Sequence, residues 1–374
     1  MPTEIGTASA AAGELARGHL DVTELPTGIP ERLPVVVAEG AAEGPEVWIT
    51  AAIHGDEATG LAAAQDVIAG LDPESLRGTV VCLPVLNPAG LRRSSRTSYY
   101  GEEDPNRGFP DPEGDRFEPP SVQELIDERL YDLFADRADV LLDLHTAGVG
   151  SVPFVIRDRV LYGELREEDE AEDLADELDR LVTATGLPAV VEYEAEEYTG
   201  KSLQRSTAGA ALNAAGIPAV TLELGSHSVV EEPGRRAGVA ACFGALAEFD
   251  VVDGIPAGVD ADESDVPDAP VDFRVRRNVG PRTDEAGIVR HRVEAGDQFE
   301  EGEVVADVVT PDGRGVTEVT AEHDGYVLGR WGGIAVYEND AVASAAVRDE
   351  GDLVVPREGD EDDADEANEA DGEN

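Results

Sequence analysis

Residues 46–71 read EVWITAAIHGDEATGLAAAQDVIAGL. The first eight are almost continuously apolar, and the fourteen residues from position 58 have helical spacing and end near a glycine. A strand buried on both faces and followed at once by a helix is typical of sheets covered by helices. This stretch therefore predicts one strand–helix unit of an α/β fold.

The same alternation extends from about residue 34 to residue 250. Further strand-like runs are PVVVAEG (34–40), TVVCLPVL (79–86), ADVLLDLH (138–145), VPFVIRD (152–158) and PAVTLELG (218–225). Helical spacing recurs at residues 121–138, 167–186 and 203–216. The predicted fold class is α/β, with a mixed, largely parallel sheet between helix layers.

Composition and pattern divide the whole chain into four parts. Residues 1–250 form the predicted α/β domain, and residues 251–270 have the Pro, Gly and Asp content of an acidic linker. Residues 271–350 have short strands and frequent Gly turns, which predict a small β barrel or sandwich. Residues 351–374 are acidic and small, and we expect a disordered tail.

The charge is strongly negative. The 374 residues include 81 acidic and 28 basic ones, for a formal net charge of −53. Such a chain repels nucleic acid and anionic membrane surfaces, so neither is an expected partner. A surface adapted to high salt is the favoured interpretation, because molar salt shortens the Debye length to about 3 Å. We therefore expect a halophilic archaeon as the source.

The N-terminus has no basic segment followed by an apolar core, and no apolar run reaches the length of a membrane span. Cys82 and Cys242 lie in apolar stretches and are expected to be buried free thiols. The expected location is the cytoplasm.

Polar side chains follow three of the predicted strands. His54 and Glu57 come after WITAAI, His145 ends VLLDLH, and Glu223 lies in VTLELG. Ligands of α/β sheets bind beyond the carboxyl ends of strands, and two imidazoles with a carboxylate are a common catalytic zinc set. The H-x-x-E spacing alone is a weak signal, because polar residues often gather in loops.

A basic segment, NPAGLRRSSRTSYYGEEDPNRGFP (87–110), stands out in so acidic a chain. Arginine suits bidentate recognition of a carboxylate, so a pocket for an anionic substrate is the favoured interpretation. The alternative is local neutralisation of Glu102 and Asp104. The arginines concerned are Arg92, Arg93, Arg96 and Arg107.

The order HGDE, NP with an Arg-rich stretch ending in DPNR, DLHTA and LELG resembles the succinylglutamate desuccinylase/aspartoacylase family, which is similar to the zinc carboxypeptidases. The resemblance covers roughly residues 35–350. It implies one Zn²⁺ per chain, held by His54, Glu57 and His145. It also implies a hydrolase that removes the acyl group of a small anionic N-acyl amino acid or a related amide.

The resemblance assigns further roles. Glu223 would be the general base that activates the water on zinc and then protonates the leaving amine. Arg96 would stabilise the oxyanion, and Asn106 and Arg107 would bind the substrate carboxylate. Asp143 is a candidate partner that orients a ligand histidine. Arg157 and Tyr198 are further possibilities for the pocket. His227 lies four residues after Glu223 but is expected, like the other remaining histidines, to be a surface or structural residue.

Two departures concern the acyl group. Extra residues, TSYYGEED, separate Arg96 from Asn106, and Pro105 stands where an aliphatic residue commonly precedes the Asn. A longer loop could reshape the pocket, so the acyl group stays unassigned.

The 271–350 segment is similar in pattern to biotinyl and lipoyl carrier domains. It contains no lysine, since the only lysine of the chain is Lys201, and a carrier role is therefore excluded. A cap over the active site or an oligomerisation surface remains, and a homo-oligomer is left open. Two other functions also stay open: a zinc carboxypeptidase that trims peptides, and a metal-free module that binds anions.

Overall fold

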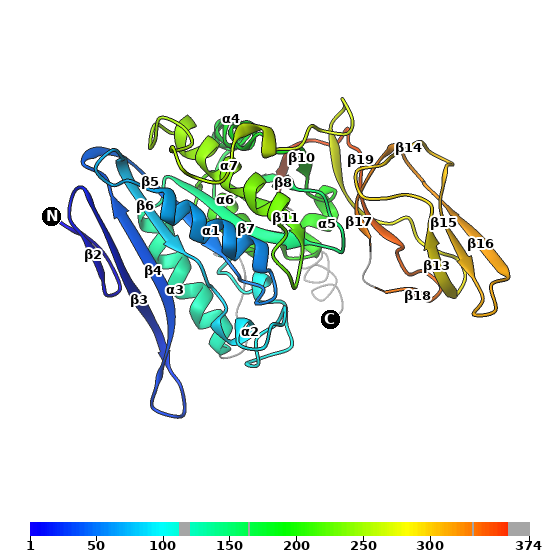
Figure 1. Ribbon diagram of the computed structural model, residues 1–374, viewed down its shortest axis with the longest axis horizontal. Coiled ribbons are helices and arrows are strands. Elements are labelled where there is room, and N and C mark those ends of the chain that lie inside the picture. Colours follow the sequence, from blue (N-terminus) through cyan, green and yellow to red (C-terminus); the bar gives the residue numbers. More distant parts are fainter. Residues whose placement is uncertain (112–119, 164, 331–332, 358–374) are drawn as a thin grey trace, which may run out of the picture.

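The computed structural model describes residues 1–111, 120–163, 165–330 and 333–357. A twelve-stranded sheet runs through the described chain in the order β14-β17-β19-β12-β10-β8-β11-β7-β5-β6-β4-β3 (Figure 1). Its strands from the first 250 residues are β3 (Glu14–Glu24), β4 (Pro30–Glu39), β5 (Ala42–Ala51), β6 (Arg77–Leu83), β7 (Val140–Ala147), β8 (Phe154–Arg157), β10 (Ala189–Val191) and β11 (Ala219–Ser226). Its later strands are β12 (Val275–Val279), β14 (Gln298–Phe299), β17 (Gly325–Arg330) and β19 (Ala343–Arg348).

Parallel pairing dominates the middle of this sheet. β6, β5, β7 and β11 run parallel to one another, whereas β8 is antiparallel to β11. β8, β10 and β12 are again mutually parallel, and the pairs at both edges are antiparallel. The mixed sheet expected from the sequence is confirmed, and it is largely parallel between β6 and β12.

Helices cover both faces of the sheet. On one face α1 (Ala58–Gly70) and α4 (Glu168–Thr185) both contact α7 (Glu232–Glu248), and on the other α3 (Val122–Arg137) contacts α6 (Thr207–Asn213). The sequence explains several ends. Ser121 and Glu124 form a capping box at the start of α3, and Gly186 ends α4 in the left-handed region at φ 69°. Shorter helical segments are α2 (Pro88–Leu91), α5 (Ala195–Gly200), η1 (Pro105–Arg107), η2 (Leu203–Arg205) and η3 (Glu263–Asp265).

The core lies between the sheet and these helices. Trp48, Phe134 and Phe243 are among its fully buried side chains. Cys82 and Cys242 are buried and unpaired, as expected. In the described part of the chain no helix is both long enough and apolar enough to cross a membrane.

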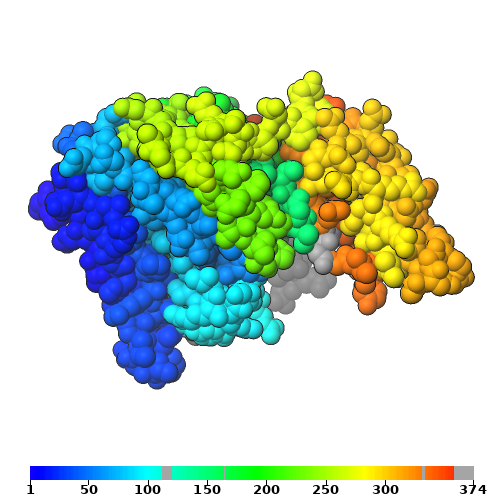
Figure 2. Space-filling model, viewed as in Figure 1, coloured from blue at the N-terminus to red at the C-terminus, as the bar shows by residue number. Residues whose placement is uncertain are grey.

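The C-terminal β region has a second sheet, in the order β16-β15-β13-β18. Its strands are β13 (Gly287–His291), β15 (Val304–Val309), β16 (Gly315–Thr320) and β18 (Ala335–Val336). Figure 2 shows the yellow and orange C-terminal residues packed directly against the green part of the α/β body. The remaining pairs are β1 (Thr3–Ile5) with β2 (Ala8–Ala10), and β9 (Val160–Tyr162) with β20 (Val354–Pro356).

The structure adds two details to the expected division of the chain. β12, β14, β17 and β19 extend the central sheet, so the 271–350 segment shares a sheet with the α/β body. β20 lies within the expected tail, whose residues 358–374 are outside the described residues.

Candidate active site

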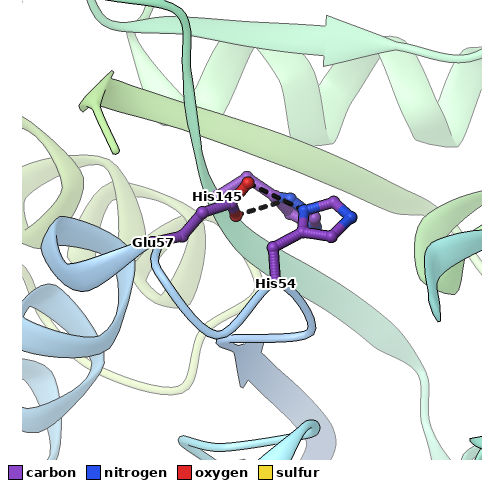
Figure 3. A group of neighbouring side chains, drawn as sticks. All are labelled: His54, Glu57 and His145. Carbon is purple, nitrogen blue, oxygen red and sulfur yellow. Dashed lines mark hydrogen bonds and ion pairs between the residues drawn. The ribbon is translucent and has the colours of Figure 1, made fainter. Parts of the chain in front are cut away.

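Three neighbouring parallel strands bring the predicted metal ligands and Glu223 together. His54 and Glu57 follow β5 and lead into α1, and His145 lies near the end of β7. In the next strand Glu223 is directly opposite His145 in the β11–β7 register. Ligand atoms of His54, Glu57 and His145 all lie within 4.8 Å of one another (Figure 3). The sequence prediction that these strand ends meet is confirmed.

Both imidazoles turn the same ring nitrogen toward Glu57. His54 Nδ1 lies 2.7 Å from Glu57 Oε1, and His145 Nδ1 lies 2.9 Å from Glu57 Oε2. The opposite nitrogens face other carboxylates: His54 Nε2 is 2.9 Å from Asp104 Oδ1, and His145 Nε2 is 2.7 Å from Asp143 Oδ2. If each Nε2 carries the proton that these carboxylates accept, each neutral ring presents a lone pair on Nδ1 to Glu57.

This arrangement fits a cation. Two lone pairs aimed at one carboxylate repel it unless a positive charge lies between them. Moreover, Glu57 Oε2 is buried and has no hydrogen bond to any described residue, although His145 Nδ1 is close to it. Two nitrogens and a carboxylate oxygen suit zinc, with a position left for a water or substrate atom.

The electrostatics point the same way. Burial would raise the pKa of Glu57, but His54 and His145 lower it, so the carboxylate is ionised. Burial would lower the pKa of both rings, whereas the adjacent carboxylates raise it. The group therefore attracts positive charge, and protons and a metal ion compete for the same Nδ1 atoms.

Glu223 lies beside this group and is almost fully buried. Burial raises its pKa, and the charge of Glu57 adds to the effect, while His145 opposes it. Its Oε2 has no hydrogen-bond partner among the described residues. A carboxylate with a raised pKa and a free acceptor atom is suited to taking up and releasing a proton.

The basic segment reaches the site through Arg96. Its Nη1 lies 3.6 Å from Glu57 Oε1, and its Nη2 donates to Asp104 Oδ2 over 2.7 Å. Asp104 thus joins Arg96 to His54. Arg92 forms a two-point ion pair with the buried Glu31. Both arginines therefore neutralise acids, which the alternative interpretation expected of this segment.

Asn106 and Arg107 differ from these two arginines. The Asn106 Oδ1 accepts from Thr207 N at 2.8 Å and from Thr207 Oγ1 at 3.0 Å, which turns its amide nitrogen toward His145. Arg107 donates to the backbone oxygens of Lys201 and Asn106. It makes no salt bridge to an acidic residue in the described part of the chain, so its charge is available to an anion.

The turn between His54 and Glu57 depends on Gly55 for a reason other than backbone freedom. The residue with a left-handed backbone in this segment is Ala52, at φ 51°, and not Gly55. Gly55 instead lies against α2, where a Cβ would come within 2.0 Å of the Gly90 carbonyl carbon. Close approach of two backbones requires the glycine.

A cavity of about 480 Å³ connects these residues with others that the sequence analysis missed. Asp158 and Glu192 line it, as do Arg277 and Arg330 from the C-terminal β region. His227, expected to be a surface or structural residue, lines the cavity. Of the two possibilities for the pocket, Arg157 pairs with Asp179 and Tyr198 is fully buried, and neither is part of the lining. Asp158 follows a buried strand, a position that could have drawn attention, but Arg277 has no local signal.

Residues 43–245 match the family model of the succinylglutamate desuccinylase/aspartoacylase catalytic domain. The chain belongs to this family. Its members therefore provide the comparison for the site residues, which lie inside the matched range except for those of the C-terminal β region.

Among curated proteins, the chain is similar to the N-alpha-acetyl-L-2,4-diaminobutyric acid deacetylase of Halomonas elongata. The two are 28% identical over 324 residues, which is 84% of this chain and 85% of the relative.

Solved structures of the family have the same fold. A succinylglutamate desuccinylase/aspartoacylase from Rhodobacter sphaeroides matches with a TM-score of 0.68 at 23% identity, over 90% of this chain and 95% of that one. The product-bound ectoine utilization protein EutE (DoeB) from Ruegeria pomeroyi matches with a TM-score of 0.68 at 22% identity, over 89% of this chain and 95% of that one.

Proposed function

We propose that this protein is a zinc-dependent hydrolase that removes the acyl group from a small N-acyl amino acid. One observation carries the proposal: Nδ1 of His54, Nδ1 of His145 and the carboxylate of Glu57 converge beside Glu223, a buried carboxyl group with an unpartnered oxygen. Two imidazoles that converge on one carboxylate beside a second, buried carboxyl group would be coincidental in a binding module for anions.

The residues divide the chemistry among them. Zinc held by His54, Glu57 and His145 would supply Lewis acidity toward a water molecule and the acyl carbonyl. Glu223 takes a proton from the attacking water and gives it to the leaving amine. Arg96 donates hydrogen bonds to the carbonyl oxygen as negative charge develops there.

Asn106 and Arg107 hold the carboxylate of the amino acid. The amide nitrogen of Asn106 faces the site because Thr207 occupies its oxygen, and Arg107 has no described acidic partner. A planar guanidinium with a neighbouring amide suits a carboxylate. Substrate held there is oriented before the reaction begins.

The cavity supports a compact substrate. About 480 Å³ accommodates a molecule of small-ligand size, whereas a carboxypeptidase also needs room for a peptide chain. The name of the Halomonas elongata relative makes Nα-acetyl-2,4-diaminobutyrate the first substrate to test. The net charge of −53 supports a cytoplasm of high salt as the setting.

A substrate panel tests the proposal. In molar KCl, the zinc-loaded protein should hydrolyse at least one acetyl-, succinyl- or formyl-amino acid. Glu223→Gln should retain zinc and lose turnover by about 10²- to 10⁴-fold, because the proton acceptor is gone. Glu172→Gln, an exposed change on α4, is the matched control and should keep full activity.

Other results would contradict the proposal. Full activity of Glu223→Gln would contradict the proton-transfer role of Glu223. Cleavage of acylated dipeptides only at the peptide bond would favour the carboxypeptidase. A protein that takes up no zinc and hydrolyses nothing would favour the anion-binding module.

A further inference from the structure

A second group of charged side chains lines the same cavity, away from the zinc ligands. Asp158 follows β8, Glu192 follows β10, and Arg277 lies in β12. These three parallel strands are neighbours in the sheet, in the order β12-β10-β8. Val191 of β10 is in register with Arg157 on one side and Arg276 on the other. The next residue of each strand is therefore at the same level, and Asp158, Glu192 and Arg277 form a row.

Charge is unbalanced along this row. Arg277 Nη1 donates to Glu192 Oε1 at 2.7 Å, which joins one basic group to one acidic group. Asp158 makes no salt bridge within the described chain, and it is two strands from Arg277, roughly 10 Å at the usual spacing. Arg277 therefore balances the charge of Glu192, whereas Asp158 adds a negative charge that no salt bridge among the described residues balances.

Asp158 is also held in place. It accepts a hydrogen bond from the Tyr198 hydroxyl, which accepts one from Asn213 Nδ2 at 3.0 Å. Both Asp158 and Glu192 are only 3% exposed, so water does little to solvate them. Burial, followed by the charge of Glu192, raises the pKa of Asp158 to about 7. Arg277 and Arg107 act in the opposite direction on this pKa but do not offset the two effects, and neither forms a salt bridge with Asp158 in the described chain.

The opposite charge is provided elsewhere in the cavity. Arg107, Asn106 and Arg96 line the part next to the zinc ligands and suit a carboxylate and a carbonyl oxygen. The cavity therefore has one region for an anion and another for a cation. Ile156 and Phe154, two and four residues before Asp158 on the same face of β8, add apolar side chains to the lining.

We infer that Asp158, with Glu192 beside it, selects N-acyl amino acids whose side chain ends in a protonated amine. The inference rests on the proposed function for the identity of the reaction, but it concerns binding of the side chain. An ammonium group within hydrogen-bonding distance of Asp158 balances its charge and replaces the water that burial removes. A substrate whose side chain ends in a carboxylate meets two carboxyl groups there and is rejected.

Binding of the free amino acids to the zinc-loaded full-length protein tests this without any turnover. The cationic probes are 2,4-diaminobutyrate, ornithine and lysine, and their neutral counterparts are homoserine and norleucine; aspartate and glutamate are the acidic probes. Calorimetry in molar KCl should give at least one cationic probe a dissociation constant about 10- to 100-fold below that of the neutral ones. The acidic probes should bind most weakly.

Asp158→Asn should reduce this preference to less than about threefold while leaving the binding of homoserine and norleucine unchanged, since Asn keeps an acceptor for Tyr198. Asp173→Asn, which removes an exposed charge on α4, is the matched control and should retain the preference. Asp158→Ser provides a second variant should the first not fold.

Neutral or acidic probes that bind as tightly as the cationic ones would overturn the inference, as would an unchanged preference in the Asp158 variants. Hydrolysis of acetylated derivatives of the same amino acids separates the two proposals. No hydrolysis with a strong cation preference would contradict the proposed function alone. Equal hydrolysis of cationic, neutral and acidic derivatives would contradict this inference alone.

Discussion

Asp158 lies in surroundings that disfavour its charge in the folded protein. Its carboxyl group is buried next to Glu192, and these two effects raise its pKa to about 7. An unfolded chain releases the same proton near pH 4. Between these two values the folded protein binds more protons than the unfolded one. The stability due to this group therefore falls as the pH rises from about 4 to about 7.

Replacing Asp158 by Asn should stabilise the ligand-free protein at pH 8 more than at pH 5. The gain in free energy of unfolding should grow by about 2–4 kcal/mol over this range, because Asn has no charge to bury. Urea unfolding at both pH values in molar KCl measures it. The Asp173→Asn control should differ from wild type equally at both pH values. A gain that does not change with pH would contradict the assigned environment.

Single site residues were predictable where a polar side chain follows a run of apolar residues in the sequence. His54, Glu57, His145 and Glu223 are polar groups at the ends of apolar strands, so the sequence placed them at one edge of a parallel sheet. Asp104 was seen only as an acid among arginines, because nothing local shows that its loop returns to His54. Asp158 and Glu192 owe their importance to the pairing of β8 with β10, which joins residues far apart in the chain.

At the scale of elements, the site depends on the contact between the turn after β5 and helix α2. Gly55 lies against the Gly90 backbone, and α2 is capped by Asn87, whose side chain accepts from Gly90 N and donates to Ile53 O. The segment that follows α2 contains Arg96, Asp104 and Asn106. The same contact therefore positions His54 and begins the loop that completes its surroundings.

Gly55→Ala should separate these two elements. The new methyl group overlaps the backbone of Gly90, which no side-chain rotation can relieve, so the free energy of unfolding should fall by about 1–3 kcal/mol. Zinc affinity should fall too, since His54 is the adjacent residue. Denaturant unfolding and a zinc competition assay measure the two effects. Gly101→Ala is the matched control, because nothing lies within 4 Å of its Cβ position. Equal behaviour of the two variants would contradict this role.

Long periodic elements were the most predictable. The helices expected at residues 58–71, 121–138 and 167–186 correspond to α1, α3 and α4 within one residue at each end. The stretch 203–216 instead contains η2 and the short helix α6, separated at Ser206, which is extended and caps α6. Ser206 bonds to the Gly209 N–H, a competition with helix formation that helical spacing does not reveal.

In the whole molecule, the C-terminal β region continues the central sheet and contributes Arg277 and Arg330 to the cavity. The sequence left a cap and an oligomerisation surface as alternatives for this region, and its contact with the cavity favours the first. The pairing of β10 with β12 joins residues more than 80 positions apart, through one register pair, Val191 with Arg276. Such a pairing depends on tertiary packing, so local patterns could not predict it.

The net charge predicts a strong dependence on salt. Carboxylates spread over the surface repel one another in dilute buffer, whereas a Debye length of about 3 Å at 1 M salt screens them. The urea midpoint should therefore rise steeply between 0.1 M and 2 M KCl. Sucrose at the same osmolality is also excluded from the protein surface, but it does not screen charges. It should therefore raise the urea midpoint less than KCl does. A midpoint that does not change with KCl would contradict adaptation to salt.

The most direct test of the account is a zinc titration of the metal-free protein, followed by hydrolysis of Nα-acetyl-2,4-diaminobutyrate in molar KCl. Activity should start near zero, rise linearly with added zinc and reach its plateau at one zinc per chain, and His145→Ala should abolish both uptake and activity. Full activity of the metal-free protein, or no hydrolysis once one zinc is bound per chain, would contradict it.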